Sequence, residues 1–232
     1  MSSSICRHDD EGDCEVANRD VVIPIVFPDY RITVDTPTLD ISIPDILPVF
    51  DLMPSHIKLP ATKQNIPYLG HAGVLFIDGK TGLTRYFEYG RYDPAAKGLV
   101  RKQHVTDVKI GQNGRPTLQT LRELLGQISV KSGQGGAIKA AYIELDSGAF
   151  SKMDNYALGR MKRNNDPKRP PYELLNNSCL HFMKSVAEAG GASMPLVIAP
   201  HPAGYIMQVR LQKNELDFDR SGIMMVEEIT LP

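Results

Sequence analysis

Residues 70–93 read GHAGVLFIDGKTGLTRYFEYGRYD, and this stretch decides the predicted fold. Residues that favour β-strands stand on both sides of a glycine-rich connection, GKTG at 79–82. A short connection of this kind between two such runs is typical of an antiparallel hairpin. The stretch therefore predicts two paired strands.

The register of this hairpin decides which side chains share a face. If the chain turns so that Asp78 lies opposite Leu83, alternation along each strand brings five residues to one face: His71, Gly73, Leu75, Tyr86 and Glu88. A slip of one residue would put Tyr89 on that face in place of Glu88.

Residues 171–191, PYELLNNSCLHFMKSVAEAGG, predict a helix that begins near its cysteine. Asn176, Asn177 and Ser178 all favour the N-cap position, so Cys179 is expected in the first turn. The unpaired N–H groups and the helix dipole favour a thiolate there. Gly190 and Gly191 are expected to end the helix.

Other stretches of the chain predict further helices and strands. Pro116 and Thr117 precede apolar residues at helical spacing, and a further helix is predicted over 151–163. AIKAAYIEL at 137–145 is typical of a buried strand, and residues 195–212 and 222–231 are also predicted to form strands. The predicted class is α+β, with an antiparallel sheet packed against the helix that carries Cys179.

The N-terminal part of the chain predicts a different organisation. Residues 1–20 are expected to be a flexible polar leader whose charges exclude a cleaved signal peptide. Residues 21–68 carry repeated prolines among β-branched residues, which predicts an extended arm of edge-type strands. Residues 69–232 are then expected to form the catalytic domain.

Composition excludes several classes of function. The formal net charge is −1, from 26 basic and 27 acidic residues, so no overall field attracts nucleic acid or anionic lipid. No apolar run is long enough to predict stable membrane insertion. Three cysteines cannot form a disulfide framework, and no group of residues has zinc spacing, so neither a metal nor a cofactor is expected.

Cys179 is the candidate nucleophile, and the alternative is that it is a buried core residue. His71 is the candidate general base, because its small neighbours would leave room for a substrate backbone. Glu88 on the same face would orient the imidazole. Of the other histidines, His181 is expected to have a packing or supporting role, and His201 is a weaker candidate base because prolines flank it.

Further side chains are candidates for the surroundings of the thiol. Backbone N–H groups near Cys179, with the amide of Asn176 or Asn177, would bind the oxyanion. Three tyrosines are candidates for lining the substrate cleft: Tyr86, Tyr89 and Tyr172.

The strand motif GHAGVLFIDGKTGLTRYFEYGRYD followed by PYELLNNSCLHFMKSV resembles circularly permuted NlpC-type papain-like proteins. In that group a strand histidine precedes the helix that bears the cysteine, as His71 precedes Cys179 here. The same order occurs in lecithin retinol acyltransferase-like proteins. The resemblance implies a permuted papain-like fold and a cysteine peptidase or amidase.

More narrowly, residues 70–191 resemble bacterial type VI secretion effectors. This resemblance implies an antibacterial toxin that cleaves peptidoglycan peptides in the periplasm of a target cell, after export from the producer's cytoplasm without a cleaved signal. It also implies a cognate immunity protein and a spike or tube component as partners. The alternatives are a thiol acyltransferase or lipase acting on lipid esters, and a catalytically inert binding or adaptor module.

Overall fold

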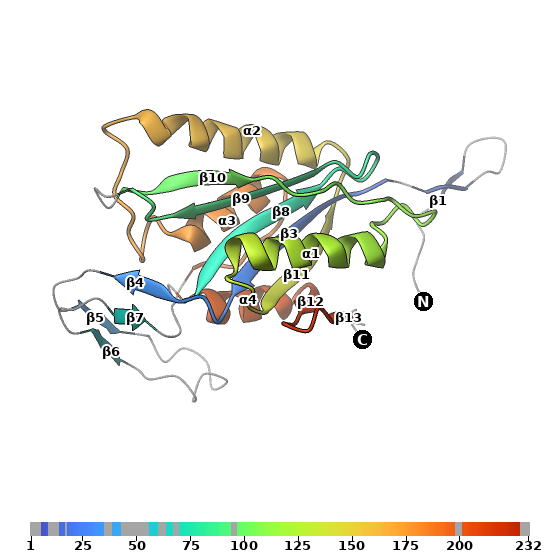
Figure 1. Ribbon diagram of the computed structural model, residues 1–232. Helices are drawn as coiled ribbons and strands as arrows, with labels where there is room; N and C mark the ends of the chain where they lie inside the picture. Colours follow the sequence, from blue (N-terminus) through green and yellow to red (C-terminus); the bar gives the residue numbers. More distant parts are fainter. Residues whose placement is uncertain are drawn as a thin grey trace.

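The computed structural model describes residues 6–8, 14–16, 18–34, 39–42, 56–59, 64–66, 70–93, 97–197 and 201–227. These residues form a mixed α+β fold with one large antiparallel sheet and helices on both of its faces (Figure 1). The α+β class predicted from the sequence, with an antiparallel sheet and helices, is therefore confirmed.

The large sheet has seven strands, and every neighbouring pair is antiparallel. From one edge to the other the order is β10 (Leu99–Gln103), β9 (Thr84–Gly90), β8 (His71–Ile77), β3 (Asp20–Phe27), β11 (Ile138–Leu145), β12 (Asn214–Phe218) and β13 (Met224–Glu227). The three strands on one side of β3 run consecutively in sequence, as successive hairpins do.

Strands β8 and β9 form the predicted hairpin in the predicted register. The Asp78 N–H donates to the Leu83 carbonyl at 2.9 Å, and Gly73 lies opposite Glu88. His71 and Glu88 consequently point to the same face at the end of β8.

Strand β3 is the central strand of the sheet, with β8 on one side and β11 on the other. The predicted edge location is wrong for residues 20–27. Pro24 lacks an N–H, and the pairing with β11 is interrupted opposite it, between the pairs Ala140 with Ile25 and Ile143 with Val22. All eight residues of β3 are buried, because both faces of the sheet are covered by helices.

Two apolar cores flank the sheet. One face packs against α1 (Leu118–Ser132) through Leu121, Leu124, Leu125 and Ile128, whereas Leu118 is exposed. The other face is covered by α2 (Ala149–Lys162), α3 (Cys179–Ala189) and α4 (Pro202–Arg210). In Figure 1 α1 lies in front of the sheet, and α3 and α4 lie behind it. The predicted helices after Thr117 and around 151–163 are both present.

The segment after α3 differs from the sequence prediction. Residues 202–210 form helix α4, where a strand was expected. Pro202 occupies the first turn, and the His201 ring accepts a hydrogen bond from the Gly204 N–H at 3.1 Å. This proline and its preceding cap start a helix, although the apolar residues on either side suggest a strand.

Three pairs of short strands lie outside the large sheet: β1 (Cys6–His8) with β2 (Cys14–Val16), β4 (Ile32–Val34) with β7 (Gln64–Ile66), and β5 (Leu39–Ser42) with β6 (His56–Leu59). They fall within the leader and arm expected over 1–20 and 21–68. Most other residues of those two segments lie outside the described residues, so the predicted division of the chain near residue 69 stays a prediction.

Candidate active site

Helix α3 begins at the predicted place, with Ser178 as its N-cap and Cys179 as its first residue. The Ser178 hydroxyl contacts His181 Nδ1 at 2.9 Å, and the Ser178 N–H donates to the same nitrogen at 3.4 Å. His181 therefore caps the helix from within its first turn, in agreement with the supporting role expected for it.

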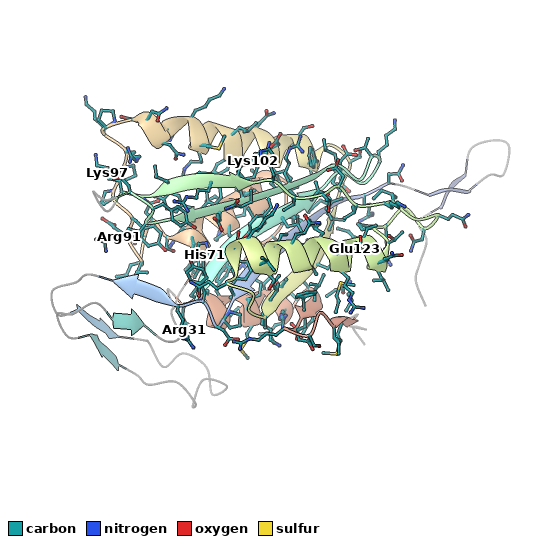
Figure 2. The ribbon with its side chains drawn as sticks, in the orientation of Figure 1. Arg31, His71, Arg91, Lys97, Lys102 and Glu123 are labelled. Atoms are coloured by element: carbon teal, nitrogen blue, oxygen red, sulfur yellow. The ribbon has the colours of Figure 1, made fainter. Side chains whose placement is uncertain are left out.

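His71 is the first residue of β8, and its imidazole lies within hydrogen-bond distance of two side chains. Its Nε2 is 3.3 Å from Glu88 Oε2 and 3.0 Å from the Tyr92 hydroxyl. The other oxygen of Glu88 accepts a bond from the Gln103 amide at 3.0 Å. Figure 2 shows His71 at the start of β8, at the left-hand end of the sheet.

The imidazole of His71 also hydrogen-bonds with Cys179, although the two residues are far apart in sequence. The predicted nucleophile, base and orienting carboxylate are thus brought together at one end of the sheet.

Electrostatics in this cluster favour charge separation. Burial alone would lower the pKa of His71, but its hydrogen bonds with Cys179 and Glu88 raise it to about 9. Burial alone would raise the pKa of the Cys179 thiol, yet the bond to His71 and its charge hold that pKa below its usual value. The raised pKa of His71 and the lowered pKa of Cys179 both favour a thiolate beside an imidazolium.

Glu88 is ionised in the same environment. Burial opposes its charge, but the hydrogen bond and positive charge of His71 hold the pKa of the carboxyl below its usual value. His71, Glu88 and Cys179 are 5%, 3% and 4% exposed, so little water screens their mutual interactions.

Aromatic rings fix the imidazole plane. The Tyr30 ring centroid is 5.0 Å from that of His71, Phe27 stacks on it at 6.2 Å, and Tyr92 meets it edge-on at 6.3 Å. Packing of this kind limits rotation of the histidine about its side-chain bonds.

The Tyr172 side chain lies beside the thiol. Its hydroxyl accepts the Cys179 N–H at 3.4 Å and also hydrogen-bonds with the thiol. The Tyr89 ring lies 5.6 Å from the Tyr172 ring, and its hydroxyl accepts a bond from the Asn177 amide at 2.9 Å. These tyrosines form a layered aromatic wall next to the start of α3.

Three other predicted residues lie elsewhere or have other partners. Tyr86 does not line a cleft: it is fully buried under α1, and its ring fills the space over Gly73 that was expected to receive a substrate backbone. The Asn177 amide also donates to the Pro171 carbonyl at 2.7 Å, which occupies the donors expected for an oxyanion. Asn176 is exposed just before α3.

His201, the weaker candidate base, is the buried N-cap of α4 and uses its Nδ1 for that purpose. Sequence reasoning missed Tyr92 and Gln103, which surround His71 and Glu88. Gln103 pairs with Tyr86 across β10 and β9, so only the third strand of the sheet identifies it. Tyr92 lies two residues after the end of β9, and its contact with His71 depends on the path of the chain beyond that strand.

Neither a metal-binding cluster nor a membrane-spanning helix occurs in the described part of the chain. No group of three or more histidine, cysteine or acidic residues there could hold a metal ion. Among the same residues, no helix has both the length and the apolar character needed to cross a bilayer. The chemical groups that the site offers are a polarised thiol, an imidazole and a carboxylate.

Comparisons with known proteins agree with one another. The family model described as type VI secretion system effector TseH-like matches residues 22–193, from within β3 to just beyond α3. The crystal structure of the type VI secretion system effector TseH is similar, with a TM-score of 0.70 and 34% sequence identity. That match covers 91% of this chain and 99% of the other. No curated protein matches the chain. The chain therefore belongs to the TseH-like family of type VI secretion system effectors.

Proposed function

We propose that this protein is a cysteine hydrolase that cleaves amide bonds in peptidoglycan peptides, with Cys179 as nucleophile. The observation that carries the proposal is the buried thiol and imidazole pair at the N-terminus of α3, oriented by Glu88. A lowered thiol pKa beside a histidine is what a nucleophilic cysteine requires at neutral pH.

In the first step the Cys179 thiolate attacks the carbonyl carbon of the amide. The Tyr172 hydroxyl, which accepts the Cys179 N–H at 3.4 Å, lies beside the sulfur and carries a proton that it can donate to the developing oxyanion. The Cys179 N–H becomes a second donor only where the oxyanion replaces that hydroxyl as its acceptor. The His71 imidazolium then gives its proton to the amine nitrogen, the carbon–nitrogen bond breaks, and a thioester remains on Cys179.

In the second step His71, now neutral, takes a proton from a water molecule that attacks the thioester. The acid product leaves, and the proton held on His71 restores the ion pair with the thiolate. Throughout, Glu88 holds the imidazole by its Nε2 and stabilises its positive charge.

The order of the functional residues supports a permuted papain-like assignment of the fold. His71 and Glu88, on adjacent strands, come before the cysteine-bearing helix, as in the NlpC-type proteins that the sequence resembles. The antiparallel sheet, with α3 packed on β8 and β9, is the arrangement that this assignment requires.

Family membership supports the biological setting that we propose. An effector of the type VI system would act as an antibacterial toxin in the periplasm of a target cell, where peptidoglycan lies. It would travel with a spike or tube component, and an immunity protein in the producer would neutralise it. Peptidoglycan peptides, the immunity protein and the secretion component are accordingly its proposed partners.

Digestion of purified peptidoglycan tests the activity. Wild-type protein should release peptide products that mass spectrometry identifies by a new amine and a new carboxyl group, and Cys179→Ala should release none. His71→Ala should lower the rate by at least about a hundredfold, since it removes both the base and the proton donor. Circular dichroism of both variants checks that the fold remains.

Three results would overturn the proposal. A Cys179→Ala protein with wild-type activity would exclude the thiol from the chemistry. Release of fatty acid from phospholipid vesicles, with peptidoglycan left intact, would instead identify a lipid acyl hydrolase or acyltransferase. The absence of any reaction, together with a thiol that fails to react with iodoacetamide, would favour an inert binding module.

A further inference from the structure

A basic cavity lies beside the candidate active site. It has a volume of about 340 Å³ and lies between the end of α2, the residues that follow it, and the strands β9 and β10. Four of its lining side chains are basic and one is acidic: Arg160, Arg163, Lys168 and Arg169, with Asp166. A cavity of this size fits a small ligand or one residue of a larger one.

Two of the four cations build the cavity walls. The Arg169 guanidinium pairs with Asp93 and donates to the Gly98 carbonyl at 3.3 Å. The Arg160 guanidinium lies 5.5 Å from the centre of the Tyr89 ring and contacts the Tyr156 hydroxyl at 3.4 Å. Their positive charge is thereby held at fixed positions.

The other two cations are available to a ligand. Arg163 and Lys168 are exposed, and among the residues that the structure describes neither side chain has an ion-pair partner. The carboxylate of Asp166 accepts the Lys168 backbone N–H at 2.8 Å, which occupies part of its capacity to bind cations. The cavity therefore carries an excess of positive charge.

The cavity is also preformed. The short helix η2 (Arg163–Asn165) is fastened to β10 by the Asn164 amide, which accepts the Val100 N–H at 2.9 Å and donates to its carbonyl at 2.8 Å. A ligand that enters does not have to order this wall, so less binding free energy is lost.

The aromatic wall connects the cavity with the thiol. Tyr89 lines the cavity and lies against Tyr172, whose hydroxyl contacts the Cys179 N–H. Asn177, two positions before Cys179, lines the cavity as well. In Figure 1 the C-terminal end of α2 lies at the same end of the sheet as the start of β8.

We propose that this cavity is a subsite for a free carboxylate of the substrate, next to the amide that Cys179 attacks. The inference rests on the proposed function and specifies its substrate as a peptide with an acidic group near the scissile bond. Guanidinium and ammonium groups bind carboxylates through charge-assisted hydrogen bonds, and planar arginine can do so with two bonds. The stem peptides of peptidoglycan carry such free carboxylates.

Calorimetric titration of the Cys179→Ala protein tests the subsite without turnover. The probes are a synthetic stem peptide with free carboxylates and the same peptide with carboxamides in their place. The free acid should bind about tenfold more tightly than the amide. Adding Arg163→Gln and Lys168→Gln should abolish this preference and leave binding of the amide unchanged.

A matched control removes the same charge elsewhere. Lys80→Gln with Lys152→Gln, two exposed lysines outside the cavity, should keep the tenfold preference. Equal affinity for the two peptides, failure of both to bind, or a preference that survives Arg163→Gln with Lys168→Gln would overturn the subsite.

Digestion by the wild-type protein separates this inference from the proposed function. Cleavage of acid and amide peptides at equal rates would leave the hydrolase in place and overturn the subsite. Selective binding of the acid by Cys179→Ala, with no cleavage by the wild type, would support the subsite and contradict the hydrolase.

Discussion

At the scale of single residues, the chemistry of the site depends on the surroundings of one imidazole. Water is nearly excluded from His71, which by itself would keep the ring neutral. Cys179 and Glu88 reverse this effect, because each offers negative charge to the ring within hydrogen-bond distance. The cation on His71 in turn stabilises both anions, so the three groups are ionised together.

The pH dependence of the proposed hydrolysis should follow from this coupling. The proposed mechanism needs a thiolate and an imidazolium, so activity should fall as pH rises through about 9, where His71 loses its proton. On the acid side activity should fall as pH drops through the lowered pKa of the Cys179 thiol. A bell-shaped profile of kcat/KM checks this expectation.

Glu88→Gln provides the matched comparison for that profile. Cys179 and Glu88 both raise the pKa of His71, and Glu88→Gln keeps the shape of the side chain but removes the contribution of the carboxylate. The pH at which activity falls on the alkaline side should therefore move below 9. An alkaline limb that stays in place in Glu88→Gln would show that the carboxylate does not set the ionisation of His71.

At the scale of elements, the start of α3 places the sulfur. Ser178 and His181 cap the helix, and the first-turn N–H groups lie around Cys179. The apolar residues Phe182, Met183 and Val186 then fasten the helix to the sheet through β8 and β9. Capping and packing thus fix the direction in which the Cys179 side chain projects from the helix.

Ser178→Ala should lower the free energy of unfolding by about 1 kcal/mol, because the helix loses the side chain of its N-cap. Urea denaturation monitored by circular dichroism measures this change. Ser151→Ala, at an exposed position of α2, is the control and should change stability by less than about 0.5 kcal/mol. Equal stability of Ser178→Ala and wild type would show that Ser178 is not a stabilising cap.

At the scale of the whole molecule, β3 joins the two halves of the sheet. It lies between the β8–β9–β10 meander, which carries His71 and Glu88, and the strands β11, β12 and β13. Six apolar residues of β3 belong to the two cores: Val21, Val22, Ile23, Ile25, Val26 and Phe27. Residues 20–27, for which an edge strand was expected, therefore contribute to the packing that forms the site.

Deleting residues 1–68 should prevent folding, since the loss of buried β3 removes roughly 10 kcal/mol of apolar burial, comparable to the whole stability of a domain. Deleting residues 1–17 should leave all seven strands of the large sheet. Thermal unfolding followed by circular dichroism compares the two proteins, with the full chain as reference. Cooperative unfolding of the 69–232 protein would show that the sheet forms without β3.

Local sequence signals determined several parts of this protein. The glycine-rich connection and the alternating residues around it fixed the β8–β9 hairpin and its register, and the polar residues before Cys179 fixed the start of α3. These features depend on contacts between near neighbours in the chain, which the sequence displays directly. The same local patterns led to a wrong prediction for α4, where proline and histidine start a helix between β-forming residues.

Only the tertiary structure decided which distant residues meet. The central position of β3, the burial of Tyr86 under α1 and the contacts of Tyr92 and Gln103 with the site all depend on how strands and helices pack. The contact between His71 and Cys179 likewise depends on how the strands and helices pack. The physical reason is that burial of both faces of the sheet is a cooperative property of the whole chain, which no local pattern of residues specifies.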